Sequence, residues 1–228
     1  MTTPNNDATS GSEPAGNDST TTAVIFGSSI PYYLDSKRLS GRRNQVRVIN
    51  ASVRGAYIKD VHAQMESVAR GDHEYFQKNS VSPDQCSITT VIISVGTNDV
   101  LSSRKGGVNH LYSPLEAMLE KAKLLFPDAQ VHVQSMVPVP LLRDYNRDNV
   151  LNFNKLTYRV CKAARCYLID VFSSFLYGRD GHLNDRLFRV NKYSGKTDIH
   201  PNSMGLSVLA RAYIKVIRGH FDPNVRFD

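Results

Sequence analysis

Four short polar blocks in this sequence contain side chains that can carry out acyl-transfer chemistry. A serine hydroxyl serves as a nucleophile when a histidine takes its proton, and neutral N–H donors stabilise the oxyanion that then forms. The blocks hold all of these groups: in chain order they are Gly27-Ser28-Ser29-Ile30, Asn50-Ala51-Ser52-Val53-Arg54-Gly55, Gly96-Thr97-Asn98-Asp99 and Asp198-Ile199-His200-Pro201.

Each block has a feature that suits such a role. Gly27 permits a sharp turn that exposes the hydroxyl of Ser29, and Gly55 leaves a backbone N–H open to close approach. Asn98 supplies a neutral donor, and His200 lies just before a proline that fixes the chain. Each block on its own could equally have a purely structural role, as a turn, an Asx turn or the start of a helix. Their joint occurrence favours a catalytic site.

Other catalytic signatures are absent from the sequence. It contains no Gly-x-Ser-x-Gly elbow, no Gly-x-x-x-x-Gly-Lys phosphate loop and no His-Glu-x-x-His helix. The remaining histidines form no ligand-spaced cluster; they are His62, His73, His110, His132, His182 and His220. We therefore expect neither a metal nor an organic cofactor.

Short apolar runs that alternate with helical patterns must position these blocks. Most of the runs have apolar residues at consecutive positions, which is typical of strands covered on both faces. Strands are predicted at Ala23–Phe26, Val46–Ile49, Ile88–Val95, Gln130–Gln134 and Cys166–Val171, and helices at Tyr57–Arg70, Pro114–Phe126, Asn149–Ala164 and Pro201–Arg218. The alternation predicts an α/β fold, a three-layer α/β/α sandwich around a five-stranded, mainly parallel sheet. Ligands bind such sheets at the carboxyl ends of the strands, where the first three blocks lie.

The four blocks, in this order, resemble the SGNH hydrolases, also called the GDSL-like hydrolase or esterase family. The order is Ser, Gly, Asn and His, one residue in each block, and some bacterial members carry the same Asn-Ala-Ser-x-x-Gly string. The blocks span roughly residues 22–220. The resemblance implies the flavodoxin-like SGNH fold. It also implies a serine esterase that cleaves an O-ester, such as an acyl or acetyl ester, without a cofactor.

The resemblance carries over to individual residues. Ser29 resembles the family nucleophile, and His200 resembles the general base that takes its proton. The backbone N–H groups of Ser29 and Gly55, together with the side chain of Asn98, resemble the oxyanion hole. Asp198 is the candidate for the acid that orients the histidine.

Two positions depart from the family pattern. The usual Gly-Asp-Ser reads Gly27-Ser28-Ser29, and the family acid normally lies three residues before the histidine, where this sequence has Thr197. Asp198 lies only two residues before the histidine, and a shift of one residue changes the direction in which a side chain points. We therefore expect Asp198 to contact the histidine loosely or not at all. A catalytically weakened domain stays open as an alternative.

Length and composition fit one folded domain behind a polar tail. Of the 228 residues, residues 1–21 are predicted to be a disordered polar tail and residues 22–228 to form the SGNH-like domain. No apolar run approaches the roughly 18 residues of a membrane span. The first residues also lack the basic and apolar parts of a signal peptide. With only three cysteines and no disulfide framework, we expect an intracellular, cytoplasmic protein.

The charge of the chain raises a second function. The net charge of +7 fits either a partner such as RNA or another polyanion, or a surface tuned for solubility. Predicted nucleic-acid contacts are Lys37, Arg38, Arg42, Arg43 and Arg47, preceded by Tyr32 and Tyr33, which could stack on bases. SGNH-like domains with a degraded site occur in the germ-plasm protein Oskar, where the domain is associated with RNA binding, and in retrotransposon-encoded proteins. Hydrolysis of a small ester and binding of nucleic acid or protein both stay open.

Overall fold

The computed structural model describes residues 20–41, 46–103, 107–140, 144–177, 181–190, 192, 195 and 197–219. Arg42 and Arg43, two of the predicted nucleic-acid contacts, lie outside the described residues. Most of the predicted tail, residues 1–19, lies outside them too. The first strand begins at Thr20, inside the segment predicted as tail, because Thr20 and Thr21 pair with residues of a neighbouring strand.

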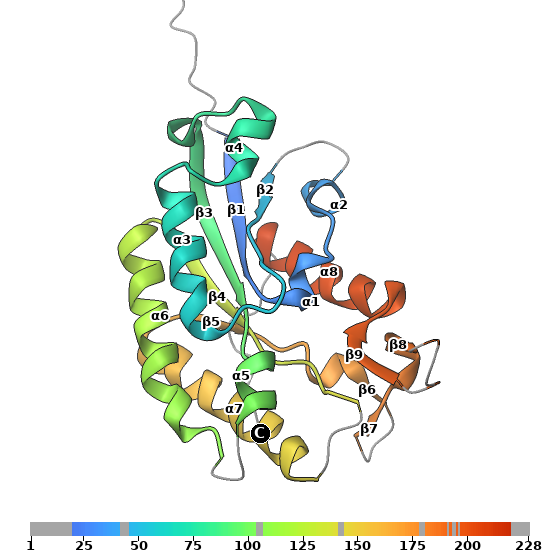
Figure 1. Cartoon of the computed structure of the whole chain (residues 1–228). Helices are drawn as coiled ribbons and strands as arrows, with labels where there is room; N and C mark the ends of the chain where they lie inside the picture. The colour runs from blue at the N-terminus through green and yellow to red at the C-terminus, as the bar shows by residue number, and fades with distance from the viewer. Residues whose placement is uncertain are drawn as a thin grey trace, which may run out of the picture.

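A five-stranded parallel sheet forms the centre of the molecule (Figure 1). Its strands lie in the order β2-β1-β3-β4-β5, and all neighbouring pairs are parallel. The strands are β1 (Thr20–Gly27), β2 (Arg47–Asn50), β3 (Cys86–Ser94), β4 (Gln130–Gln134) and β5 (Tyr167–Ile169). With helices on both faces, this is the predicted α/β/α sandwich, and the prediction is confirmed.

Two hydrophobic cores lie on the two faces of the sheet. In β1, Val24 and Phe26 join one core while Ala23 and Ile25 join the other, and all four are fully buried. Successive side chains of a strand point to opposite faces, so burial on both sides requires the continuous apolar run seen in the sequence.

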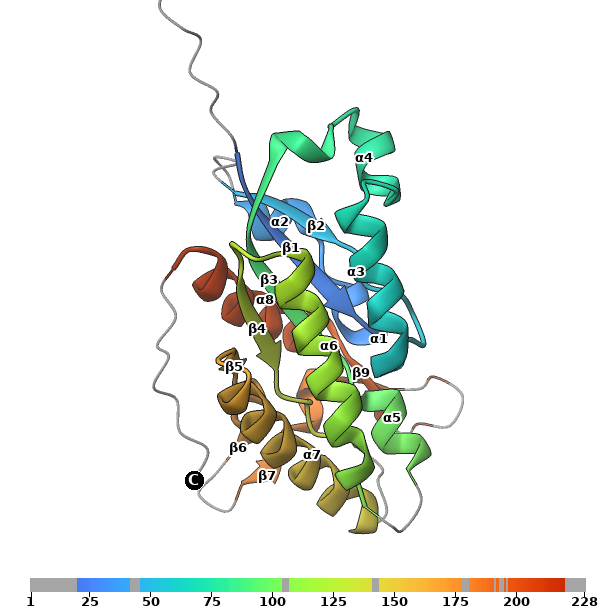
Figure 2. The same cartoon turned by 90° about the vertical axis from the view of Figure 1, so that its left-hand side faces the viewer.

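Helices cover both of these cores. Figure 2 shows three of them in front of the sheet, α3 (Val61–Ala69), α6 (Tyr112–Leu125) and α7 (Asp144–Ala163). The other face carries α1 (Ser29–Tyr32), α2 (Ser36–Ser40) and α8 (Ser203–Ile217), and two further short helices are α4 (Glu74–Asn79) and α5 (Thr97–Ser102). Within the described part of the chain, no helix has the length and apolar character needed to cross a membrane.

The predicted start of the last helix, at Pro201, is wrong by two residues. Helix α8 begins at Ser203, because the side chain of Asn202 accepts the N–H groups of Met204 and Gly205 at 2.9 and 3.2 Å. Pro201 instead ends a short strand, β9 (Thr197–Pro201), which pairs antiparallel with β8 (Phe188–Val190). A second short pair, β6 (Leu176–Tyr177) and β7 (His182–Leu183), lies nearby in sequence.

The strand order brings the first three polar blocks together. The central position of β1, between β2 and β3, means that the blocks following these three strands start from adjacent strand ends. The chain moves outward from β1 to β2 on one side and to β3 on the other, so this is the point where the strand order reverses. Such a switch point is where open α/β sheets bind ligands.

Candidate active site

Ser29 stands on a sharp turn at the carboxyl end of β1. It is the first residue of α1, and the preceding Ser28 donates its N–H to the carbonyl of Ser94 at 3.1 Å. A Cβ atom on Gly27 would lie 2.1 Å from that same carbonyl oxygen. Only glycine fits there, so the turn can approach β3 closely and present the half-buried Ser29 beyond the sheet.

Two side-chain amides hold this turn in place. Gln64 of α3 is buried; its Oε1 accepts the N–H of Gly27 at 2.9 Å and its Nε2 donates to the carbonyl of Gly27 at 3.0 Å. Asn50, at the end of β2, donates to the carbonyls of Pro31 and Leu34 at 2.8 and 3.1 Å. The sequence reasoning missed both roles. For Gln64, the sequence did contain a signal, because a polar glutamine stands among the apolar side chains of a predicted helix.

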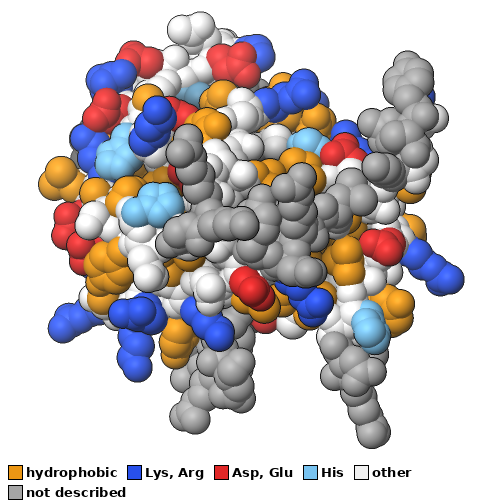
Figure 3. Space-filling view, turned by 60° about the horizontal axis from the view of Figure 1, so that its bottom comes forward, with side chains coloured by type: hydrophobic (Ala, Val, Ile, Leu, Met, Phe, Trp, Pro, Cys, Tyr) orange, Lys and Arg blue, Asp and Glu red, His pale blue; other side chains and the backbone are white. Residues whose placement is uncertain are grey.

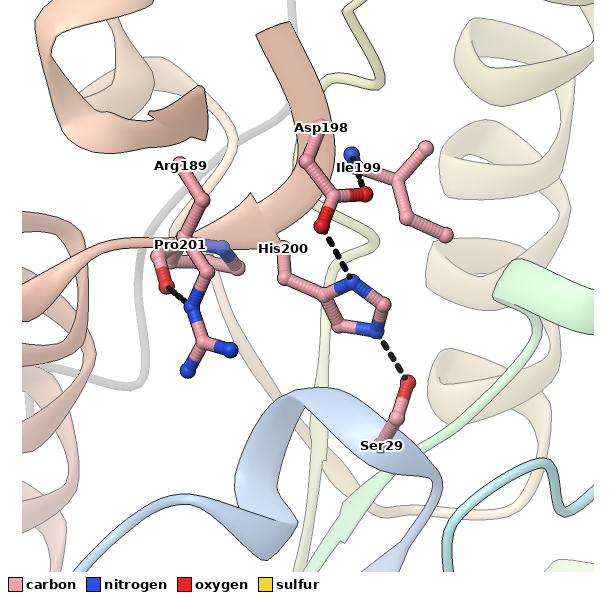
Figure 4. Close-up of polar contacts among 6 residues, drawn as sticks. All are labelled: Ser29, Arg189, Asp198, Ile199, His200 and Pro201. Atoms are coloured by element: carbon pink, nitrogen blue, oxygen red, sulfur yellow. Dashed lines mark hydrogen bonds and ion pairs between the residues drawn. The ribbon is translucent and has the colours of Figure 1, made fainter. Parts of the chain in front are cut away.

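Asp198, His200 and Ser29 lie in a row (Figure 4). The Nε2 atom of His200 is 3.1 Å from the Oγ atom of Ser29, and its Nδ1 atom is 3.2 Å from the Oδ2 atom of Asp198. The other carboxylate oxygen accepts the N–H of Ile199 at 2.6 Å. When the proton of the imidazole is on Nδ1, the ring can donate to Asp198 and accept the hydroxyl of Ser29.

The expectation that Asp198 would contact His200 loosely or not at all is wrong. It assumed a loop leading directly into a helix, whereas both residues belong to β9. Residues two apart in a strand point to the same side of the chain, which brings the carboxylate beside the imidazole.

The third block holds the second block in position. Asn98 donates its side-chain N–H to the carbonyl of Ala56 at 2.9 Å, and the carboxylate of Asp99 accepts the N–H of Ile58 at 3.2 and 3.4 Å. Burial raises the pKa of Asp99, and the hydrogen bond from Ile58 opposes that rise. These contacts anchor the backbone on both sides of Tyr57, just after Gly55, so the end of the second block is held against α5.

The N–H of Gly55 is available to a ligand. Gly55 has a φ of +79°, in the region that favours glycine, and a Cβ built there would meet nothing within 4 Å. Among the described residues, no acceptor is bonded to this N–H. The N–H of Ser29 is at the first position of α1, where a helix supplies no acceptor of its own. Asn98 likewise has a second amide hydrogen besides the one that it donates to Ala56.

An apolar cavity of about 430 Å³ lies on the same edge of the sheet. It is bounded by the segment after β4, by the first turns of α7 and by β6 and β7, and its apolar lining includes Val139, Val150, Leu151, Phe172 and Leu183. Such a lining suits a hydrocarbon chain. Among the described residues, no group of three or more His, Cys, Asp or Glu side chains is arranged to hold a metal ion.

The structure describes three of the predicted nucleic-acid contacts, Lys37, Arg38 and Arg47. Lys37 and Arg38 lie on α2, and Arg38 is highly exposed, 3.7 Å from the carboxylate of Asp35. Arg47 lies at the amino end of β2, away from the polar blocks, and donates to the carbonyl of Gln85 at 3.3 Å and to the sulfur of Cys86 at 3.0 Å. Where side chains are coloured in Figure 3, basic groups are scattered among acidic and apolar ones.

Of the two tyrosines expected to stack on bases, Tyr33 is already engaged. The guanidinium carbon of Arg189 lies 4.3 Å from the centre of its ring, so one face of that ring is covered. Tyr32 is 48% exposed and packs edge-on against Tyr33. Of the two rings, Tyr32 is therefore the more accessible. The sequence reasoning did not single out Arg189, which lies shortly before the fourth block and far from Tyr33 along the chain.

Comparison with known proteins agrees with this architecture. The family model of the GDSL-like lipase/acylhydrolases matches residues 18–206. No curated protein sequence matches the chain. Several solved structures share its fold. Their sequence identities to this chain are low, so the likeness concerns the fold and does not extend to function.

Three of these structures illustrate the likeness. A lipase/acylhydrolase from Enterococcus faecalis superposes with a TM-score of 0.61 at 20% identity, covering 90% of this chain and 100% of that one. A GDSL-like lipase from Bacteroides thetaiotaomicron gives a TM-score of 0.58 at 17% identity, covering 89% and 90%. An acetyl xylan esterase, AlAXEase, gives 0.60 at 18% identity, covering 86% and 98%.

Proposed function

Since the chain belongs to the GDSL-like lipase/acylhydrolase family, we propose that it is a serine esterase in which Ser29 attacks an ester carbonyl and His200 accepts the serine proton. The observation that carries the proposal is the continuous contact from Asp198 through His200 to Ser29, at 3.2 and 3.1 Å. A serine, an imidazole and an acid in this order are recognised by their geometry on unrelated folds.

The reaction follows from the positions of these groups. As the Oγ atom of Ser29 bonds to the carbonyl carbon, its proton moves to the Nε2 atom of His200, and Asp198 stabilises the imidazolium that forms. The carbonyl oxygen becomes an oxyanion, which accepts from the N–H groups of Ser29 and Gly55 and from Asn98. The intermediate collapses, and the leaving alcohol takes the proton from His200. Water then repeats the sequence and releases the acid.

The substrate of this proposal is an O-ester of a short or medium acyl group. The apolar cavity beside the segment after β4 offers room for the hydrocarbon part of an acyl group. One of the structures that share the fold is an acetyl xylan esterase, which supports an acetyl or other short acyl ester. The proposed steps use only groups of the protein itself, and no cofactor takes part.

A fluorophosphonate probe and a short-chain activated ester test the proposal directly. The parent protein should react covalently with the probe and hydrolyse para-nitrophenyl acetate or butyrate, whereas Ser29→Ala should do neither. Mass spectrometry of the labelled protein should place the adduct on the peptide that contains Ser29. Labelling of another residue, or hydrolysis that survives Ser29→Ala, would refute the mechanism.

Asp198→Asn should lower the turnover number by about 10–100-fold, well below the roughly 10⁴-fold loss when a serine protease loses its buried triad acid. The side chain of Asp198 is 40% exposed, and one of its oxygens accepts the N–H of Ile199. Water therefore screens its charge, and a water molecule can take over part of its role in orienting the imidazole of His200. Steady-state kinetics on one activated ester would measure the loss. A loss equal to that of His200→Ala would show that Asp198 acts as a full triad member.

RNA binding is the second candidate function, and the net charge of +7 is the observation that favours it. Under this proposal, Lys37 and Arg38 on the exposed face of α2 contact phosphates. The affinity for single-stranded RNA should then fall steeply as salt rises, because neutralised phosphates release counterions. Replacing Lys37 and Arg38 with Gln should make the slope of log affinity against log salt concentration shallower, by the amount expected for the loss of about two phosphate contacts. Absence of salt-sensitive binding at low ionic strength would eliminate this function.

A further inference from the structure

Two guanidinium groups from distant parts of the chain lie near the ring of Tyr33. Arg189 of β8 lies 4.3 Å from the centre of the Tyr33 ring, and Arg54 of the second block lies 5.9 Å from the same point. The ring of Tyr33 in turn packs edge-on against the imidazole of His200, with ring centres 6.0 Å apart. Two positive charges thus lie around an aromatic ring that packs against the imidazole of the proposed base.

Arg189 is oriented by the same strand that carries the histidine. Its Nε atom donates to the carbonyl of Pro201 at 3.2 Å, and Pro201 directly follows His200 in β9 (Figure 4). Among the described residues, no acceptor is bonded to its two terminal nitrogens. Arg54 directly precedes Gly55, whose N–H belongs to the proposed oxyanion hole, and its side chain lies in the exposed part of the second block.

In the part of the chain that the structure describes, no Asp or Glu side chain is paired with either arginine. Four other basic side chains near the surface do form such pairs with Asp or Glu: Arg38, Arg70, Lys78 and Lys121. The nearby carboxylate, Asp198, is directed at His200 instead. Holding two like charges around one ring costs free energy, and an anion bound between or beside them would recover it.

We propose that Arg54 and Arg189 select esters that carry a carboxylate or phosphate group close to the ester bond. The guanidinium fork matches both anions and binds them bidentately. The anionic group takes no part in bond making or breaking; it holds the substrate so that its carbonyl lies over Ser29. The inference rests on the proposed function, because it concerns the substrate of that same site.

A matched series of activated esters tests the selectivity. The para-nitrophenyl half-esters of succinate, glutarate and adipate are compared with neutral para-nitrophenyl esters of equal acyl carbon count, and phosphonate-terminated acyl esters form a third arm. The best anionic ester should exceed its neutral counterpart by about tenfold in kcat/KM at low salt, a typical gain for a charge-assisted bidentate contact. Because both arginines are partly or fully exposed, the preference should weaken toward physiological ionic strength. The carboxylate and phosphonate arms show which anion fits better.

Variants assign the preference to these arginines. Arg54→Gln should reduce the ratio of anionic to neutral kcat/KM toward one, and Arg189→Lys should reduce it in part, since lysine keeps the charge but not the fork. Arg70→Gln, which removes an equal charge from an exposed arginine at the end of α3, should leave the ratio unchanged. Melting temperatures would confirm that each variant is folded.

A binding measurement separates this inference from the proposed function. In the Ser29→Ala protein, saturation-transfer NMR should detect the anionic esters at lower concentration than the neutral ones, and Arg54→Gln in that background should remove the difference. Preferential binding without hydrolysis by the parent would uphold the inference and refute the esterase. Hydrolysis without an anionic preference, or a preference that persists in Arg54→Gln, would overturn the inference.

Discussion

Replacing Ser29 with alanine should lower the turnover number for a short-chain activated ester by about 10⁴–10⁶-fold, since serine hydrolases lose that much when the nucleophile is removed. His200→Ala should cost a comparable factor, because the hydroxyl is a poor nucleophile unless the Nε2 atom, 3.1 Å away, takes its proton. The double variant should be no slower than either single one. Groups that act as one unit are strongly non-additive in this sense.

Stability and a matched serine control make the first prediction specific. Ser29 is half-buried, and among the described residues its Oγ atom bonds only to His200, so the melting temperature of Ser29→Ala should stay close to that of the parent. Ser207→Ala removes a hydroxyl from an exposed position on α8 and should keep full activity. A Ser29→Ala protein that melts normally and still hydrolyses the ester would remove this serine from the mechanism.

Asn98→Ala should lower the turnover number by about 10²–10³-fold, which is the usual cost of losing one oxyanion donor. The loss should appear in kcat with little change in KM, because the donor acts on charge that develops only in the transition state. Steady-state kinetics on para-nitrophenyl butyrate would separate the two constants. A change confined to KM would assign Asn98 to substrate binding.

Asp99→Asn serves as the matched control for this second prediction. Asn98 also tethers the second block by donating to the carbonyl of Ala56, so its loss could act through that tether. Asp99 tethers the same segment through the N–H of Ile58, and an asparagine oxygen can accept that bond as well. Asp99→Asn should therefore retain activity, whereas Asp99→Ala loosens the tether. A loss in Asp99→Ala as large as that in Asn98→Ala would show that positioning accounts for the effect of Asn98.

The sequence by itself determined the sheet, because a strand that is buried on both faces requires apolar residues at consecutive positions, and such runs are visible in the sequence. A strand such as β1 has to be apolar at consecutive positions, and such runs alternating with helical patterns have few stable arrangements. The sequence also showed which residues could do the chemistry, since Ser29, Asn98 and His200 each follow or precede a predicted element. The four-residue strand β2 was found because the run Val46–Ile49 is apolar at three of its four positions.

The short strands, and the contacts that depend on them, could not be predicted from the sequence. Strand β9 contains Thr, Asp and His and pairs with the three-residue β8, so neither alternation nor apolar content marks it in the sequence. The contact between Asp198 and His200 depends on that strand, because only extended backbone places residues two apart on one side. The spacing alone predicted a poor contact.

Tertiary structure also decided which distant side chains share the site. Gln64 reaches Gly27 because α3 packs across β1, and Arg189 reaches Tyr33 because the pairing of β8 with β9 brings it beside His200. Neither contact has a local signal, since each joins segments far apart in the chain through the packing of whole elements. The sequence thus determined the groups available for chemistry and the sheet that carries them. Packing and strand pairing decided which of those groups meet, because only the folded chain brings residues distant in sequence within reach of one hydrogen bond.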